Sequence, residues 1–138
     1  MATIEAQIEG ALFKRVAELV TTPALALQWP NQHYEPVDGT PYLIVQHAPN
    51  DTERALIAST GAHRHLGLLM LTIAAPLDGI AIATTELAGQ IAAHFPCDLR
   101  IALGSISVRI AKRPSVKSGA QEENRWRVPI VVDYECWA

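Results

Sequence analysis

Two stretches of the chain carry apolar residues at helical spacing. The first stripe consists of Ile4, Ile8, Leu12, Val16 and Leu19. It predicts a helix over residues 4–19, and the Thr3 hydroxyl can cap its first turn by accepting an orphan backbone N–H. The second stripe consists of Ile80, Ala83, Leu87 and Ile91. It predicts a second helix over about residues 79–94.

Shorter runs between and after these helices predict β-strands. Tyr42–His47 is the first, and Arg54–Ser59 is a weaker candidate. Arg64–Ala75 is the longest run and is almost continuously apolar, so we expect both of its faces to be covered at its centre. Ser105–Lys112 and Asn124–Glu135 alternate apolar and polar residues, as half-exposed antiparallel strands do.

Prolines and polar residues predict the connections. Residues 23–41 contain four prolines, which predicts an irregular loop. The apolar residues expected to anchor this loop are Leu25, Leu27 and Trp29. Residues 49–51 read as a turn, and the polar segment 114–123 reads as a mobile hairpin loop. Pro129 falls on the outward phase of the last strand and predicts that this strand lies at a sheet edge.

The order of helix, strands, helix, strands predicts an α+β fold. We expect a mostly antiparallel sheet of four to five strands packed on one side by two helices. The length of 138 residues fits a single domain over residues 1–138, and 49% hydrophobic residues are too many for a disordered chain. No run is long enough for a membrane helix, so a cytosolic, soluble domain is expected.

Charge is distributed unevenly around a formal net charge of −3. Residues 1–99 hold four basic and ten acidic side chains, whereas residues 100–127 hold seven basic and two acidic ones. We expect Arg109, Arg125 and Arg127 to form an outward row on neighbouring strands. A second copy of the chain can supply the acidic surface, head to tail, and such contacts close into rings. Ordinary solvated charge is the alternative.

Few residues form a chemical motif. His63 and His65 form an H-x-H that can bind zinc, but a third ligand is not identifiable in the sequence. The chain contains no nucleophile elbow, phosphate loop or dinucleotide motif. Cys97 and Cys136 are interpreted as free thiols. No cofactor, membrane contact or direct nucleic-acid contact is therefore predicted.

Several short segments occur in an order that resembles a known family. They are Trp29-Pro30-Asn31, Tyr34-Glu35-Pro36, Gly39-Thr40-Pro41-Tyr42-Leu43, Gly67, Pro76-Leu77-Asp78-Gly79, His94-Phe95-Pro96 and Trp126-Arg127-Val128-Pro129-Ile130. Together they resemble small bacteriophage and prophage proteins that are similar to tail terminator (tail completion) proteins. The resemblance covers nearly the whole chain.

The resemblance implies a structural function. It implies an α+β fold and assembly into a homo-oligomeric ring, commonly a hexamer, that caps the tail tube and meets the head–tail connector. It implies no catalysis, and it places the protein in the host bacterial cytoplasm during assembly and in the virion tail afterwards.

Rings of this kind often carry flexible arms that become ordered on assembly. Two polar connections, residues 50–65 and 114–124, are the candidates here. The residues predicted to contact the neighbouring subunit or another partner are Arg54, His63, Arg64, Arg109, Lys117, Arg125 and Arg127.

Two alternatives stay open beside the tail terminator hypothesis. One is a small α+β enzyme or ligand-binding domain that uses His63 and His65 for a metal. The other is a different head–tail joining protein, such as a neck protein, with a similar fold.

Overall fold

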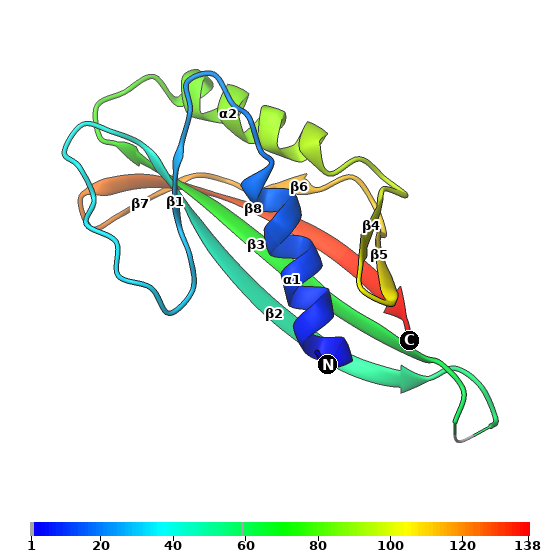
Figure 1. Ribbon diagram of the computed structural model, residues 1–138. Helices are drawn as coiled ribbons and strands as arrows, with labels where there is room; N and C mark the ends of the chain where they lie inside the picture. Colours follow the sequence, from blue (N-terminus) through cyan, green and yellow to red (C-terminus); the bar gives the residue numbers. More distant parts are fainter. Residues whose placement is uncertain (1, 59) are drawn as a thin grey trace.

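The computed structural model describes residues 2–58 and 60–138. The elements in chain order are α1 (Ile4–Ala17), β1 (Ala26–Gln28), β2 (Tyr42–Arg54), β3 (His63–Pro76), α2 (Ala81–His94), β4 (Arg100–Leu103), β5 (Ile106–Ile110), β6 (Ser115–Val116), β7 (Ala120–Glu122) and β8 (Arg125–Trp137). Figure 1 shows how α1 and α2 lie beside a twisted sheet. The α+β class and both helices are as predicted.

The sheet is larger than predicted and is mixed. Its strand order is β1-β2-β3-β8-β5-β4, and β6 and β7 also pair with β8, which makes eight strands. β1 is parallel to β2, and the other pairings are antiparallel. The expectation of four to five antiparallel strands was wrong because β1, β4, β6 and β7 have only two to four residues each, too few to show a period.

β2 passes through the segment that was predicted to be a turn. It pairs with β3 from Tyr42 to Arg54, and the register shifts between Pro49 and Thr52. This register shift accommodates Pro49 within the strand, which continues on both sides of it. The predicted strand Arg54–Ser59 was wrong, since residues 55–58 form the connecting loop; Ser59 lies outside the described residues.

β8 lies inside the sheet, so the edge position predicted from Pro129 was wrong. β3 pairs along one side of β8, and β5, β6 and β7 pair in succession along the other. The Pro129 carbonyl accepts a hydrogen bond from the Lys117 N–H at 2.8 Å. The nitrogen and carbonyl of a strand residue point to the same side, so the missing donor of Pro129 faces the gap between β6 and β7.

The segment predicted to be a mobile hairpin loop is partly ordered as sheet. β6 pairs with Ile130 and Val131, and β7 pairs with residues 125–127. The chain between β5 and β8 therefore runs back along β8 as a strap. We use the name strap for residues 114–122.

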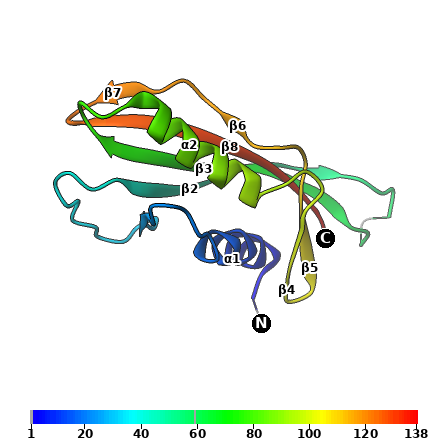
Figure 2. The same ribbon diagram turned by 90° about the horizontal axis from the view of Figure 1, so that it is seen from above.

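Both helices contribute to one core on the inner face of the sheet (Figure 2). α1 buries Ile8, Ala11, Leu12 and Val16, and the Thr3 hydroxyl caps it through the Ala6 N–H at 3.2 Å, as predicted. Every second residue of β3 from Leu69 to Ala75 belongs to this core. Neither helix is long and apolar enough, in the residues described, to cross a membrane.

The outer face of the sheet keeps an apolar surface. Its half-buried members, here named the outer patch, are Ile44, Leu68, Met70, Pro129 and Val131. They alternate with core residues along β2, β3 and β8, so they point away from both helices. The prediction that both faces of the longest strand are covered is met in full on the inner face and in part on the outer face, where the residues are half-buried.

Candidate functional site

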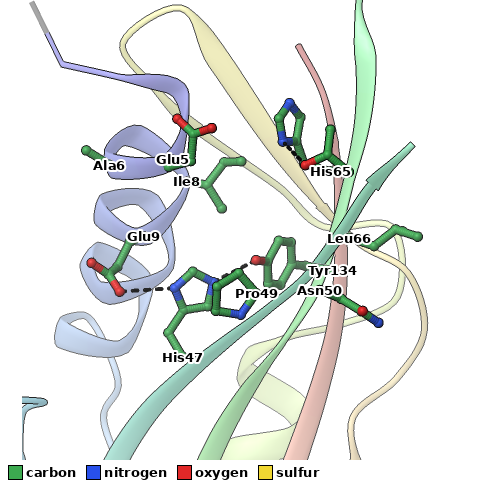
Figure 3. Close-up of a pocket in the computed structure, with 11 residues that line it drawn as sticks. Glu5, Ala6, Ile8, Glu9, His47, Pro49, Asn50, His65, Leu66 and Tyr134 are labelled. Atoms are coloured by element: carbon green, nitrogen blue, oxygen red, sulfur yellow. Dashed lines mark hydrogen bonds and ion pairs between the residues drawn. The ribbon is translucent and has the colours of Figure 1, made fainter. Parts of the chain in front are cut away.

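A pocket of about 410 Å³ opens between the first turns of α1 and the long strands. Figure 3 shows Glu5 and Glu9 on the helix side, and His47, His65 and Tyr134 on the strand side. The pocket lies where the inner face of the sheet extends beyond the helix. The pocket is a candidate site because titratable side chains from four elements line it.

His47 stands at the centre of a hydrogen-bonded chain in this pocket. Its Nδ1 lies 3.1 Å from Glu9 Oε1, and its Nε2 lies 2.6 Å from the Tyr134 hydroxyl. A phenol donates to Nε2 when Nδ1 carries the proton and donates it to the carboxylate. Both ring nitrogens are thus occupied by the protein, which leaves neither for a substrate or a metal.

Tyr134 is held as a neutral phenol. Burial, together with the smaller effects of Cys136 and Glu9, raises its pKa to about 12. Its ring lies over Gly67, the residue opposite it on β3. A Cβ at Gly67 would lie 2.4 Å from the Tyr134 hydroxyl oxygen, so the glycine makes room for the ring. The network therefore ties α1, β2 and β8 together and is structural in character.

His63 and His65 lie two residues apart on β3, as the H-x-H pattern predicted. His65 Nδ1 lies 3.3 Å from the Thr52 hydroxyl, and the backbone of His63 pairs with Ala138 in both directions. No group of three His, Cys, Asp or Glu side chains suited to a metal occurs in residues 2–58 and 60–138. The zinc hypothesis thus gains no third ligand from the described residues.

The Glu135 carboxylate forms ion pairs with two of the residues that were predicted to lie at an interface. Its carboxylate accepts hydrogen bonds from the Arg64 Nε at 3.0 Å and from the Arg109 Nε at 2.7 Å, although it is only 6% exposed. Burial alone would raise the pKa of Glu135, but the hydrogen bonds from Arg109 and Arg64 outweigh burial and hold it below its usual value. Asp98 and Glu53 pair with the outer sides of the two guanidinium groups.

Arg125 and Arg127 lie at the other end of β8 and do not form a row with Arg109. Arg109 is paired with Glu135, eight positions along β8 from Arg127. Arg125 donates to the Thr40 and Val37 carbonyls at 2.7 and 2.9 Å and lies over the Tyr42 ring. These contacts fix the proline-rich loop against the outer face of the sheet.

Arg127 and Lys117 differ in their surroundings. Arg127 lies 3.7 Å from Glu122 and Glu123, which is too long for hydrogen bonds. The Lys117 side chain is exposed on the strap. The sequence prediction that these residues contact a partner stays a prediction.

The loop between β2 and β3, here named the tip, comprises residues 55–58 and 60–62. The Arg54 Nε donates to the Leu56 carbonyl at 3.1 Å, and its Nη2 donates to the Ile57 carbonyl. Gly61 lets Leu56 fold back, because a Cβ there would lie 2.9 Å from Leu56 Cδ1. The Ile57 side chain is nevertheless 95% exposed. Arg54 thus holds the tip in shape while leaving an aliphatic side chain in water.

A second hollow, of about 340 Å³, lies at the far end of β3, where the strand reaches α2. Its polar lining residues are Asp78, Thr84 and Gln121, and its apolar ones are Pro76, Leu77, Ile80, Ala81 and Trp126. Ile80 is 75% exposed, and Trp126 packs over Gly119 of the strap. We name this hollow the end pocket.

The buried network and the end pocket were not predicted from the sequence. His47 ends the predicted strand Tyr42–His47 and follows Leu43 and Val45 at a spacing of two, so it points inward with them. This spacing was the available signal. The end pocket has no such signal in the sequence, because its residues come from segments that are far apart along the chain.

Comparisons with known proteins give the family and the fold. One solved structure, whose designation states no function, superposes with a TM-score of 0.78 at 23% sequence identity, covering 98% of this chain and 96% of that chain. This similarity supports the fold. No curated protein matches the chain. A protein-family model described as "Phage tail terminator protein" matches residues 7–134.

Proposed function

This chain belongs to the phage tail terminator protein family, and we propose that it caps the tail tube as one subunit of a homo-oligomeric ring. In this proposal the ring also presents a surface to the head–tail connector. The chain is then a structural tail protein that works in the virion tail through contacts with copies of itself and with its neighbours.

The outer patch is the observation that carries the assembly part of the proposal. Five half-buried residues on three long strands form an apolar face that neither helix covers. Apolar surface of this kind gains free energy when another protein removes it from water. A subunit that completes its burial only in the assembled tail explains why β3 is apolar on both faces.

The enzyme hypothesis finds little support in the pocket geometry. A general base needs a free nitrogen or oxygen within reach of a substrate, and His47 shares both ring nitrogens with Glu9 and Tyr134. A structural role also agrees with membership of a family of structural tail proteins. The ion pairs around Glu135 likewise join strands rather than face the pocket.

Deletion of the gene from the phage or prophage that encodes the chain tests the proposal. We expect tail tubes of irregular length that do not join heads, and restoration of normal particles when the protein is supplied in trans. Electron microscopy of the particles measures both effects.

Immunogold labelling of complete particles provides the location. We expect label at the head-proximal end of the tube. Tubes of normal length that fail only to join heads would identify a neck protein instead, and particles without the protein would contradict both assignments.

A further inference from the structure

The tip and the end pocket lie at opposite ends of the molecule. β3 begins beside the tip at His63 and ends at the end pocket with Pro76. Thirteen steps along an extended strand span about 43 Å. Figure 1 shows the tip projecting beyond the C-terminal end of β8, away from α2. Contact between the two sites within one chain is therefore impossible.

The two sites match each other in apolar character. The tip presents Leu56 and Ile57 to solvent, and the end pocket combines an apolar wall that contains Ile80 and Trp126 with polar residues such as Thr84 and Gln121. When a projecting aliphatic side chain docks against the apolar wall of a hollow, both surfaces leave water and the free energy falls. Because Arg54 and Gly61 already shape the tip, little conformational entropy is lost when it docks.

The tip and the end pocket each have a charged side chain beside them, and the two charges have opposite signs. Arg54 at the base of the tip is bonded to backbone carbonyls and has no carboxylate within ion-pair distance among the described residues. Asp78 lines the end pocket and likewise has no cationic partner in the described chain. When the tip docks in the end pocket, the positive charge of Arg54 on one copy lies near the negative charge of Asp78 on the next. This attraction favours the tip-to-pocket contact over a tip-to-tip contact.

We infer that the tip of one subunit docks into the end pocket of the next copy of this chain. This inference rests on the proposed function and specifies the contact that propagates its ring. The two surfaces are different parts of the molecule, so the contact is heterologous and repeats around a closed ring when the rotation permits. Each subunit then gives its tip to one neighbour and receives the tip of the other.

Cysteine cross-linking tests the contact directly. In a Cys97→Ser background, which removes the exposed thiol, the variant Ile57→Cys/Ile80→Cys is treated with a short bismaleimide. We expect a ladder of covalent oligomers beyond the dimer on a denaturing gel. The control pairs Ile57→Cys with Val20→Cys, an aliphatic position that at 87% is at least as exposed as Ile80 and lies outside the end pocket, and should give no ladder.

Mixing two single variants tests the direction of the contact. Chains with Ile57→Cys alone, mixed with chains carrying Ile80→Cys alone, should yield mixed dimers and no larger species. Dimers from Ile57→Cys alone would show a symmetric tip-to-tip contact and overturn the inference. In parallel, Ile57→Asp should weaken self-association by roughly tenfold or more, whereas Val20→Asp should leave it unchanged.

Oligomeric state is measured by light scattering on the same samples. Oligomers without a ladder would overturn this contact and leave the proposed function standing. If the purified protein is monomeric, the same double variant is cross-linked in assembled tails. A missing ladder there overturns the inference, whereas absence of the protein from tails overturns the proposed function itself.

Discussion

Gly67 on β3 leaves space for the Tyr134 ring on the neighbouring strand, β8. Tyr134 stands opposite it and extends across it to His47. We predict that Gly67→Ala destabilises the protein by about 1–3 kcal/mol, because the added methyl group collides with the tyrosine ring in a packed core. Urea unfolding followed by circular dichroism measures the change.

Gly89 in α2 is the matched control. A Cβ at that position meets nothing within 4 Å. Gly89→Ala should therefore stabilise the protein by about 0.5–1 kcal/mol through higher helix propensity. Equal losses in the two variants would contradict the packing argument for Gly67.

Glu135 predicts a specific pH dependence. Because its folded pKa lies below its usual value, its ion pairs contribute stability that is present at neutral pH and is lost as pH falls through that folded pKa. We predict that Glu135→Gln lowers the melting temperature by several degrees at pH 7. The difference from the parent protein should shrink steadily below about pH 4.

Thermal melts between pH 3 and pH 8 measure this effect. Glu86→Gln serves as the control, because Glu86 is exposed on α2 and forms no ion pair within the described residues. A Glu135→Gln deficit that stays constant with pH would assign the loss to packing instead of charge.

For the arginines, the sequence predicted the face of the sheet but not the partner of each side chain. Alternation along β5 and β8 correctly assigned Arg109 and Arg125 to the outer face of the sheet. The sequence pattern could not show that Arg109 and Arg64 share Glu135, since the three residues come from three strands whose register only the fold sets.

At the scale of elements, the strap is the least expected feature. Its two short strands pair with one side of β8 and bring Gly119 against the Trp126 ring. The ring occupies the space that a side chain at this position would need. The strap is therefore docked through a glycine contact as well as through backbone hydrogen bonds.

We predict that Gly119→Ala loosens the strap. A Cβ there would lie 2.3 Å from Trp126 Cζ2, so either the ring or the strap must move. Amide hydrogen exchange at residues 115–122 should accelerate by roughly tenfold, while exchange in the centre of β3 stays unchanged. Ser118→Ala, one residue earlier and exposed, is the control. Unchanged exchange in the Gly119 variant would refute the contact.

At the scale of the whole molecule, a charged substitution in the outer patch is predicted to impair assembly much more than folding. Met70→Glu places a charge on the apolar outer face, at a half-buried position outside the core. We expect a stability loss of only about 1 kcal/mol, together with failure to enter tails. Thermal melts and immunoblots of purified particles measure the two properties.

Thr85→Glu on the exposed side of α2 is the control for this variant, since it adds the same charge elsewhere. We expect it to enter tails normally. If Met70→Glu also entered tails at the level of the parent protein, the outer patch would have no part in assembly.

The sequence by itself determined the α+β class, both helices, β3, β5, β8, the first half of β2 and the family resemblance. The helices and strands follow from local periodicity or apolar runs, which the backbone geometry of helix and strand imposes directly, whereas the resemblance rests on the order of short segments. Only the tertiary structure decided the short strands, the interior place of β8, the pairing of Arg64 and Arg109 with Glu135, and the distance between tip and end pocket. Each depends on strand register and on contacts between distant segments, and periodicity carries no information about either.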